Sequence, residues 1–262
     1  MTQAGDRSPE TDRSRELDYG SYLALDELLG AQRPLSRPEH HDELLFIVVH
    51  QASELWFKVV LHELDELVAR LGRADAPAAL LTLRRINDLV AIVTNQLSAL
   101  DTLPPRRFNE FRGYLGSSSG SQSEQFRAIE VTSGLRDREF LNIIAEPENL
   151  PPLVQRALSR PTLEALFEAM VAARGVTLEQ VYTDDALTML LLLAEELLRY
   201  EQAFSRWRFV HVQLVERIIG PDTAGTGGSL GAKDLRKTVD FRFFPKLWAM
   251  RSRLYGAAQP ST

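Results

Sequence analysis

The sequence predicts an all-α protein, and three observations support this prediction. Apolar residues recur at helical spacing along most of the chain, strict apolar–polar alternation is almost absent, and no repeat with a period of about 20 to 50 residues is found. With 262 residues and 44% apolar content, the chain can bury a core of its own. We expect residues 1–16 to form a disordered polar tail and residues 17–262 to form one helical domain.

The composition excludes several classes of protein. The chain has no cysteine, so disulfides, thiolate metal sites, iron–sulfur clusters and cysteine nucleophiles are ruled out. A net charge of −6 and scattered arginines argue against a nucleic-acid partner. The polar N-terminus lacks the apolar region of a signal peptide, and no run of about 18 uncharged apolar residues occurs. We therefore expect a cytoplasmic protein that does not contact a membrane.

The first half of the chain predicts a short helix followed by two long ones. Tyrosines and leucines at helical spacing predict a helix over residues 19–30 that ends at Gly30. The prolines of "RPLSRPEHHDE" predict a loop after it. Residues 43–71 keep an apolar period of about 3.6 residues, which is the strongest helix signal in the chain. A second long helix is predicted over residues 77–100, ended by the prolines of "DTLPPRR".

The second half begins with a polar segment and continues with further helices. "FRGYLGSSSGSQSEQFR" places a run of serines and glycines behind Arg112 and predicts a loop. Residues 123–142 are expected to be helical, whereas prolines interrupt residues 144–160. Helices are predicted over residues 162–174 and 184–219. After the loop "PDTAGTGGSLG", a final helix over residues 231–256 is interrupted by "FRFFP".

The five histidines differ in their sequence contexts. His40 and His41 are adjacent in the proline loop, where we expect solvated side chains. His62 lacks the second histidine of a zinc-protease motif. His50 and His211 each interrupt the apolar part of a long helix. A buried histidine bonded to a backbone carbonyl explains either one alone, whereas two in a chain without thiols also suggest a heme pocket within a helical bundle. No Glu-x-x-His pair occurs, which argues against a di-iron site.

Four blocks of the sequence together resemble the tryptophan 2,3-dioxygenase family. The blocks are "YGSYLALDELL", "HHDELLFIVVHQASELWFK", "FNEFRGYLGSSSGSQSEQFRAIE" and "WRFVHVQLVERIIGPDTAGTGGSLG", in the family's order. The resemblance covers about residues 17–250. It implies a helical homotetramer with one heme b per subunit, L-tryptophan and O₂ as substrates, and oxidative opening of the indole ring to N-formylkynurenine.

The resemblance also implies roles for individual residues. His211 matches the axial histidine of the heme iron, and His50 matches the histidine on the opposite face, near the indole N–H. Phe46 matches the ring that packs on the indole, and Arg112 matches the arginine that binds the substrate carboxylate. Ser119 and Thr226 match residues near the heme propionates and the substrate ammonium group. Tyr19, Tyr22 and Leu23 match residues that reach into a neighbouring subunit's pocket.

Residue types and spacing agree with these roles. Phe46 and His50 are four residues apart and therefore share one helix face. An arginine offers the two-pronged donor that a carboxylate accepts. A loop of glycines and serines can bring backbone N–H groups and hydroxyls close to a charged ligand.

Three positions depart from the family pattern: Gly113 in place of a polar residue, Ser121 in place of an aromatic one, and Leu230 in place of a serine. The loss of a ring at Ser121 could enlarge the pocket and alter specificity. Three hypotheses follow. The chain is an indole-cleaving dioxygenase, a related heme monooxygenase acting on tryptophan or a substituted tryptophan, or a heme- or ligand-binding protein without catalytic activity.

Overall fold

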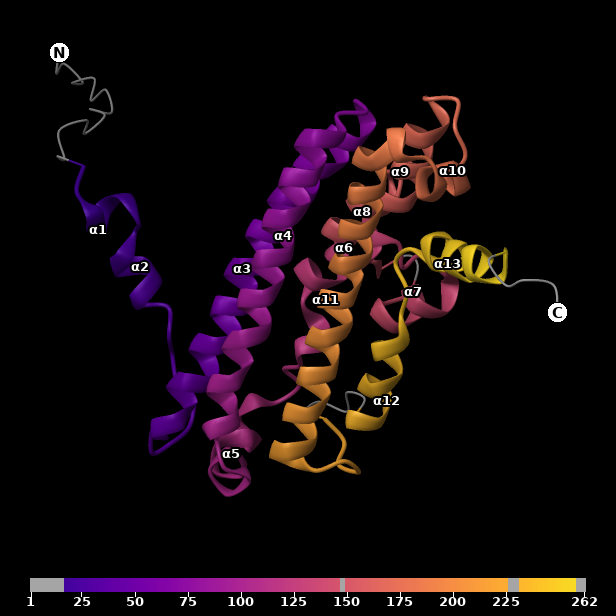
Figure 1. Ribbon diagram of the computed structural model, residues 1–262. Helices are drawn as coiled ribbons and strands as arrows, with labels where there is room; N and C mark the ends of the chain where they lie inside the picture. Colours follow the sequence, from indigo (N-terminus) through magenta and orange to yellow (C-terminus); the bar gives the residue numbers. More distant parts are fainter. Residues whose placement is uncertain (1–16, 147–148, 226–230, 258–262) are drawn as a thin grey trace, which may run out of the picture.

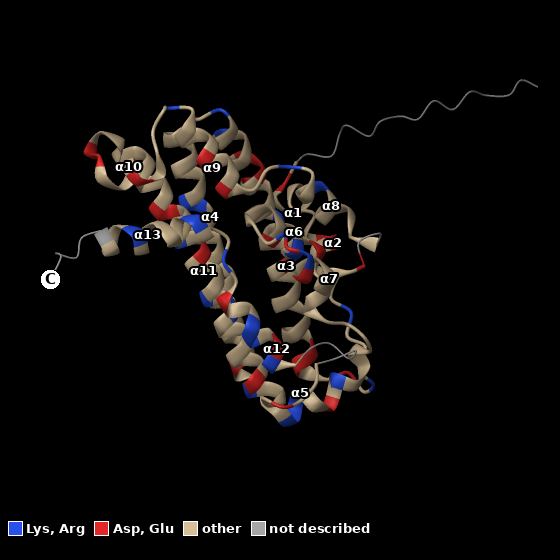
Figure 2. Cartoon of the chain, turned by 90° about the vertical axis from the view of Figure 1, so that its right-hand side faces the viewer, with Lys and Arg blue, Asp and Glu red and all other residues tan. Residues whose placement is uncertain are grey.

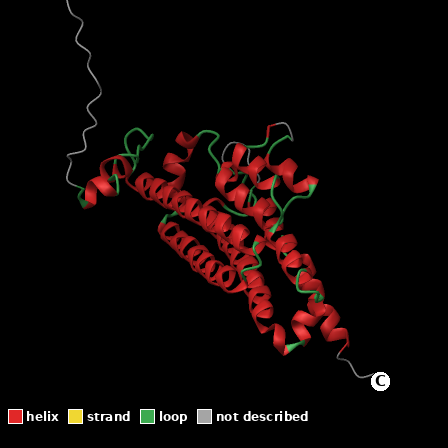
Figure 3. Ribbon diagram, turned by 90° about the horizontal axis from the view of Figure 1, so that it is seen from above, coloured by secondary structure: helices red, strands yellow, loops and turns green. Residues whose placement is uncertain are grey.

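The chain folds into helices joined by short loops. The computed structural model describes residues 17–146, 149–225 and 231–257, and no strand occurs among them (Figures 1 and 3). The predicted all-α class is confirmed at this level. The predicted disordered tail, residues 1–16, lies outside the described residues.

Three long helices form the centre of the molecule: α3 (His41–Gly72), α4 (Ala76–Gln96) and α11 (Thr188–Ile219). Helix α4 packs extensively against both α3 and α11, whereas α3 and α11 have no extensive contact with each other. The three run side by side in Figure 1. This arrangement leaves facing sides of α3 and α11 available for a site between them.

Local sequence explains where the long helices begin. The ring of His40 accepts a hydrogen bond from the backbone N–H of Asp42, and two acidic residues in the first turn of α3 favour the positive end of its dipole. Asp75 caps α4 by accepting from the N–H of Ala78, and a proline lies in the first turn. These signals place both starts within two residues of the sequence prediction.

Shorter helices surround this centre. Helix α6 (Glu124–Ser133) packs against α3 and against α8 (Pro152–Leu158), and α9 (Leu163–Ala172) also contacts α3. The remaining helices after residue 133 are α7 (Arg138–Ile144), α10 (Leu178–Thr183), α12 (Ala232–Lys237) and α13 (Pro245–Ala257). Figure 2 shows acidic and basic residues interspersed along the helices rather than gathered into a stripe.

The sequence prediction was wrong in several places, and it also missed α8 and α10. The helix expected over residues 19–30 is two helices, α1 (Tyr19–Tyr22) and α2 (Leu25–Leu29), because Ala24 adopts φ 49° between them. The helix expected over residues 123–142 ends at Gly134, where φ is 151° and an added Cβ would lie 2.5 Å from the carbonyl oxygen of Phe243. Helix α5 (Pro105–Arg112) was not predicted.

The interruption expected at "FRFFP" is confirmed, and Glu201 of α11 explains how this segment is held. The fully buried carboxylate accepts hydrogen bonds from the backbone N–H groups of Phe243 and Phe244, at 2.6 and 2.8 Å. It also accepts one from the indole N–H of Trp248, at 2.6 Å. One buried acid therefore satisfies donors that the break between α12 and α13 would leave unpaired.

Two apolar surfaces remain without a partner in the single chain. Helices α1 and α2 extend away from the long helices (Figures 1 and 3). On α3, one face carries exposed apolar side chains at helical spacing: Leu44, Val48, Leu55 and Val59. By length and composition alone, α3 could also cross a membrane, but buried helices of soluble proteins pass the same test. We call these four residues the α3 stripe.

Candidate functional site

The aromatic part of the candidate site lies where α3 meets α5. The rings of Phe46 and His50 lie 4.2 Å apart between centroids, as their spacing of four residues predicts. Phe46 also contacts Phe108 and Phe111 of α5, with centroid distances of 5.6 and 5.8 Å. Phe108 and Phe111 belong to a buried apolar cluster that α3, α5 and the end of α11 share. This cluster supports Phe46 on the side of α5.

His50 is held in one orientation by its own helix. Its Nδ1 lies 2.7 Å from the carbonyl oxygen of Phe46, so Nδ1 carries a proton and donates it to that oxygen. Loss of water around the ring lowers the pKa of His50, although the hydrogen bond to Phe46 and the negative charge of Glu54 act in the opposite direction. Near pH 7 the ring is therefore neutral, and Nε2 presents a lone pair that can accept a hydrogen bond.

His211 is positioned on α11 by a stacked indole. The ring of Trp207, one turn earlier, lies 5.2 Å from the imidazole with an interplanar angle of 23°. Trp207 is itself packed against Phe126 and Phe57. Burial, with a smaller contribution from the positive charge that His50 carries when protonated, lowers the pKa of His211 to about 4. A neutral imidazole with an available lone pair is the form that binds a metal ion.

His50 and His211 thus occupy the two helices that α4 holds apart. Their spacing in the sequence could not show that they approach each other, but Val49, next to His50, and Leu214, one turn after His211, share one buried apolar cluster. The structure therefore brings together the two histidines that the sequence singled out.

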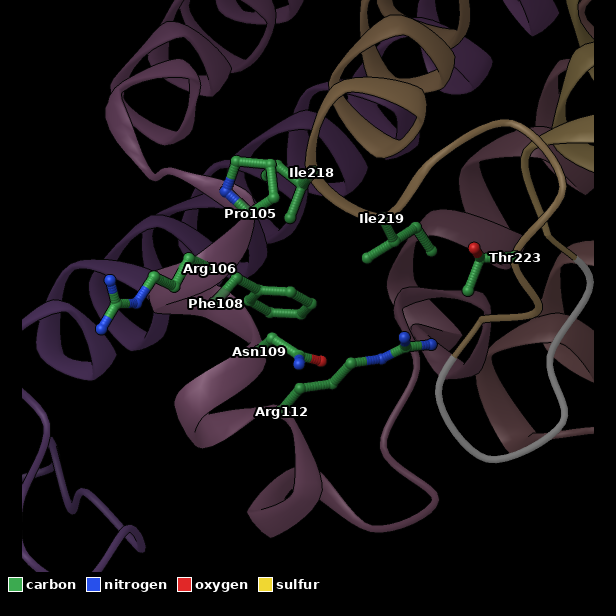
Figure 4. A pocket seen from close by; sticks show the side chains of 8 residues that line it. All are labelled: Pro105, Arg106, Phe108, Asn109, Arg112, Ile218, Ile219 and Thr223. Atoms are coloured by element: carbon green, nitrogen blue, oxygen red, sulfur yellow. The ribbon is translucent and has the colours of Figure 1, made fainter.

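Arg112 is the last residue of α5 rather than a residue of the polar loop. Its Nη2 donates to the carbonyl oxygen of Ala224 at 2.6 Å. It also lines a cavity of about 390 Å³ together with apolar residues of α5 and α11 and polar residues beside them (Figure 4). The lining residues are Pro105, Arg106, Phe108, Asn109, Arg112, Ile218, Ile219 and Thr223. Phe108 connects this cavity to the Phe46 ring.

The polar segment after α5 is more ordered than a plain linker. Ser119 caps a short 3₁₀ turn, Gly120–Gln122, by accepting from the N–H of Ser121 at 3.3 Å, and the two hydroxyls lie 2.9 Å apart. Arg127 of α6 donates to the carbonyl oxygen of Ser121 at 3.2 Å. Ser121 is thus solvent-exposed at the turn, where the family resemblance leads us to expect an aromatic ring. Thr226 and Leu230 lie outside the described residues.

The N-terminal residues of the predicted site are not brought to it within one chain. Tyr19 and Tyr22 are 76% and 72% exposed, and Leu23 is 40% exposed. Their helix, α1, has the cap and capping box of an ordered turn, formed by Asp18 and Ser21. These side chains have no buried environment in the single chain, so any role in the site requires a second copy.

The sequence prediction missed several contributing residues and misjudged one. Phe108 and Phe111 pack against Phe46, and Trp207 stacks on His211. In the sequence, the only indication of these contacts was an aromatic residue close to a predicted site residue. The expectation that His40 is solvated was wrong, because its side chain is only 14% exposed and its Nε2 lies 3.0 Å from Glu110. His41 is exposed as expected, with a side-chain exposure of 90%.

The residues present fit a heme better than a metal ion held by protein side chains alone. Among the described residues, no group of three or more histidine and acidic side chains comes together in a way that could hold a free ion. His211 instead offers one neutral, oriented imidazole, as an axial heme ligand does. Beside it, the indole N–H of Trp207 is buried and has no hydrogen-bond partner in the described structure. A single nitrogen ligand beside aromatic rings suits an iron whose remaining equatorial ligands would come from a porphyrin rather than from the protein.

Comparisons with known proteins agree with this site. The family model described as tryptophan 2,3-dioxygenase matches residues 3–147 and 162–254. Proteins named tryptophan 2,3-dioxygenase from Kineococcus radiotolerans and Saccharopolyspora erythraea are each 40% identical to the chain; the alignments cover 93% of the chain and 93% and 95% of these relatives. One from Anaeromyxobacter sp. strain K is 41% identical over 92% of the chain and 97% of its own length. The chain therefore belongs to the tryptophan 2,3-dioxygenase family, a family of heme-dependent dioxygenases.

Proposed function

We propose that the protein uses O₂ to cleave the C2–C3 bond of the indole ring of L-tryptophan, giving N-formylkynurenine. Both oxygen atoms enter the product, so the reaction balances without an external reductant. The observation that carries the proposal is the fixed orientation of His50, whose Nε2 lone pair is directed by the Nδ1–H bond to Phe46. Family membership supports the reaction class.

The indole end of the substrate lies against Phe46 and His50 in this proposal. A neutral Nε2 can accept the indole N–H, whereas a protonated ring could not. The Phe46 ring supplies a face on which the indole packs, and Phe108 and Phe111 keep that ring from moving away. A planar substrate with one N–H is thus held at both its face and its edge.

The amino acid end is bound by Arg112. Its guanidinium already donates to the carbonyl oxygen of Ala224, and a carboxylate is a stronger acceptor than that neutral carbonyl. The proposal adds Ser119 and Thr226 near the ammonium group and the heme propionates. Tyr19, Tyr22 and Leu23 would then close the pocket from a neighbouring subunit.

His211 would hold the iron of heme b, one per subunit. When bound, ferrous heme supplies the site at which O₂ binds and is activated. The stacked Trp207 holds the imidazole in one plane, and the low pKa of His211 keeps its nitrogen free for the metal at neutral pH. His50, on α3, would not bind the iron and would instead accept a hydrogen bond from the substrate.

We further propose a homotetramer in the cytoplasm, without a membrane or nucleic-acid partner. The α3 stripe is an apolar helix face that a second copy would cover, and the exposed tyrosines of α1 need a partner surface as well. Assembly would then complete each pocket with an N-terminal segment from a neighbour.

The test is turnover of L-tryptophan by the reduced, heme-loaded protein in the presence of O₂ alone. The proposal requires N-formylkynurenine in amounts that exceed the enzyme many times over, with one O₂ consumed for each tryptophan. A hydroxylated or oxindole product that forms only when reductant is added would favour the monooxygenase alternative, which Ser121 suggests because it stands where an aromatic ring is expected. If no product forms with or without reductant, the remaining hypothesis is a heme-binding protein without catalytic activity.

A further inference from the structure

The contacts between α3 and α5 have a consequence for substrate selection. Helix α3 carries Phe46 and His50, which hold the indole in the proposed function, and α5 ends with Arg112, which holds the carboxylate. The relative position of these two helices therefore sets the distance between the two ends of the binding site. Whatever fixes that position also fixes the substrate length that the site accepts.

Polar contacts join the two helices at the start of α3. The carboxylate of Asp42, in the first turn of α3, forms an ion pair with Arg107 of α5, and the two atoms Oδ2 and Nε lie 2.6 Å apart. His40, which caps α3, lies 3.0 Å from the carboxylate of Glu110, one turn further along α5. The ring of His40 also packs on Phe111, with centroids 5.2 Å apart. We call His40, Asp42, Arg107 and Glu110 the α3–α5 clamp.

The two pairs of the clamp are well placed to resist movement. Arg107 and Glu110 are three residues apart on α5, so they lie on the same side of that helix. Two contacts at different points along a helix oppose both sliding and rotation, whereas one contact would act as a pivot. The hydrogen bond from His40 holds the pKa of Glu110 below its ordinary value, so this carboxylate stays charged at neutral pH.

Aromatic packing alone does not fix the register of α5. Phe46, Phe108 and Phe111 contact one another through tilted or edge-on rings at 5.3 to 5.8 Å. Such contacts are strong but tolerate small shifts, because dispersion and hydrophobic burial are not directional. The charged and hydrogen-bonded pairs supply the directional component.

We infer that the α3–α5 clamp is a positioning device that selects the side-chain length of the amino acid substrate by fixing Arg112 relative to Phe46 and His50. The inference rests on the proposed function, since it takes Arg112 and His50 as the two ends of the binding site. The clamp residues themselves do not touch the substrate. Their effect is on which amino acid fits, more than on whether the site forms.

The test compares L-tryptophan with L-homotryptophan, which has one more methylene between the ring and the α-carbon. In the heme-loaded protein, KM is measured for L-tryptophan and the inhibition constant for L-homotryptophan. The double variant Arg107→Ala/Glu110→Ala removes one partner from each pair of the clamp. We expect KM for L-tryptophan to rise about tenfold, because misplacing a binding group by about 1 Å is costly. The inhibition constant for L-homotryptophan should change less than twofold, so the preference for tryptophan narrows.

Two further variants separate positioning from general stability. Arg160→Ala removes an ion pair with Asp65 that also joins α3 to a neighbouring segment at similar exposure, but away from α5. It should leave both constants unchanged. The single variant Arg107→Ala should reduce the preference for L-tryptophan over L-homotryptophan. Arg107→Lys keeps the positive charge opposite Asp42 and should retain part of that preference.

Three results would overturn the inference. One is an unchanged preference in the double variant, and another is an equal loss of both affinities together with loss of heme, which would mean that the clamp only stabilises the fold. If the wild-type protein cleaves tryptophan and the double variant gives either of these results, the clamp alone is contradicted. A wild-type protein that binds neither amino acid contradicts the proposed function and the clamp with it.

Discussion

His50 and His211 differ in the groups that surround their imidazole rings. The Nδ1–H of His50 is bound to the carbonyl oxygen of Phe46, which leaves Nε2 as an acceptor directed outward. His211 is stacked on Trp207 and has a pKa of about 4, which leaves a lone pair that would bind iron in the proposed function. The two roles predict different responses to the same substitution.

We expect His211→Ala to lose most of its heme, because the only protein ligand proposed for the iron is removed, whereas His50→Ala should keep heme and change turnover. The measurement is the ratio of Soret absorbance to protein absorbance after gel filtration, followed by activity. Equal heme loss in both variants would indicate that both rings bind the iron, and it would contradict a site for O₂ opposite His211.

Arg112→Ala should raise KM for L-tryptophan at least 30-fold. A desolvated arginine–carboxylate pair that loses its cation typically costs about 2 to 5 kcal/mol, since the remaining charge is left unpaired. Arg112→Lys should recover only part of the affinity, because an ammonium group cannot make the two-pronged contact.

Indole analogues without a carboxylate provide the control for Arg112, and they should bind wild type and Arg112→Ala almost equally. The measurement is steady-state kinetics with tryptophan and spectral titration with the analogue. An Arg112→Ala variant with unchanged tryptophan kinetics would show that the carboxylate is bound elsewhere.

At the scale of elements, the sequence predicted the helices that have a long apolar periodicity. The long helices α3 and α11, and the interruption at "FRFFP", follow from apolar spacing and local breakers. Helix α5 is only 8 residues long and begins at a proline, so its signal resembled the end of the preceding helix. Arg112 belongs to α5, so the sequence assigned this residue to the wrong element, and its role in binding stays a prediction.

Contacts between elements were beyond the reach of the sequence pattern. The approach of His50 and His211 depends on α4 packing against both of their helices. The stacking of Trp207 on His211 required knowledge of side-chain direction, although their spacing of four residues allowed it. The buried state of His40 depends on Glu110, 70 residues later, which no local rule could indicate.

The loop before α3 is anchored by Glu43, which is 1% exposed. Desolvation alone would raise the pKa of Glu43, but hydrogen bonds from the hydroxyl of Ser36 and from the backbone N–H groups of Leu35 and Ser36 outweigh it and lower the pKa. Because the folded pKa is depressed, this stabilisation is present above the unfolded value of about 4.5 and is lost as pH falls through the lower folded value.

We therefore expect Glu43→Gln to destabilise the protein by about 2 kcal/mol at pH 7, which corresponds to a fall in Tm of about 5 °C. The difference from wild type should shrink as pH falls below about 4.5. Thermal unfolding at several pH values measures this effect. Glu39→Gln, at an exposed position of the same loop, is the control and should behave as wild type. A difference that stays constant across this pH range would mean that the carboxylate charge is not responsible.

At the scale of the whole molecule, the proposed completion of the site by assembly rests on the exposed α1 and the α3 stripe. We expect Tyr19→Ala/Tyr22→Ala subunits to have weak activity, because their N-terminal segments no longer close a neighbour's pocket. Arg112→Ala subunits should also be weak, but their N-terminal segments are intact. Hybrids formed by co-expressing the two should regain activity, since an intact segment then meets an intact pocket.

The measurement is the specific activity of hybrids isolated with two different affinity tags, beside each variant alone. The recovered activity should approach a fixed fraction of wild type that depends on subunit arrangement. Hybrids no more active than the average of the two parents would mean that each chain completes its own pocket.

The central claim is that this site inserts both atoms of one O₂ into L-tryptophan. The most direct measurement is mass spectrometry of the product formed by the reduced, heme-loaded protein under ¹⁸O₂ in unlabelled water, analysed before exchange of the carbonyl oxygens. We predict N-formylkynurenine that carries two ¹⁸O atoms. A product with a single ¹⁸O atom and an intact C2–C3 bond, formed only with added reductant, would contradict the account.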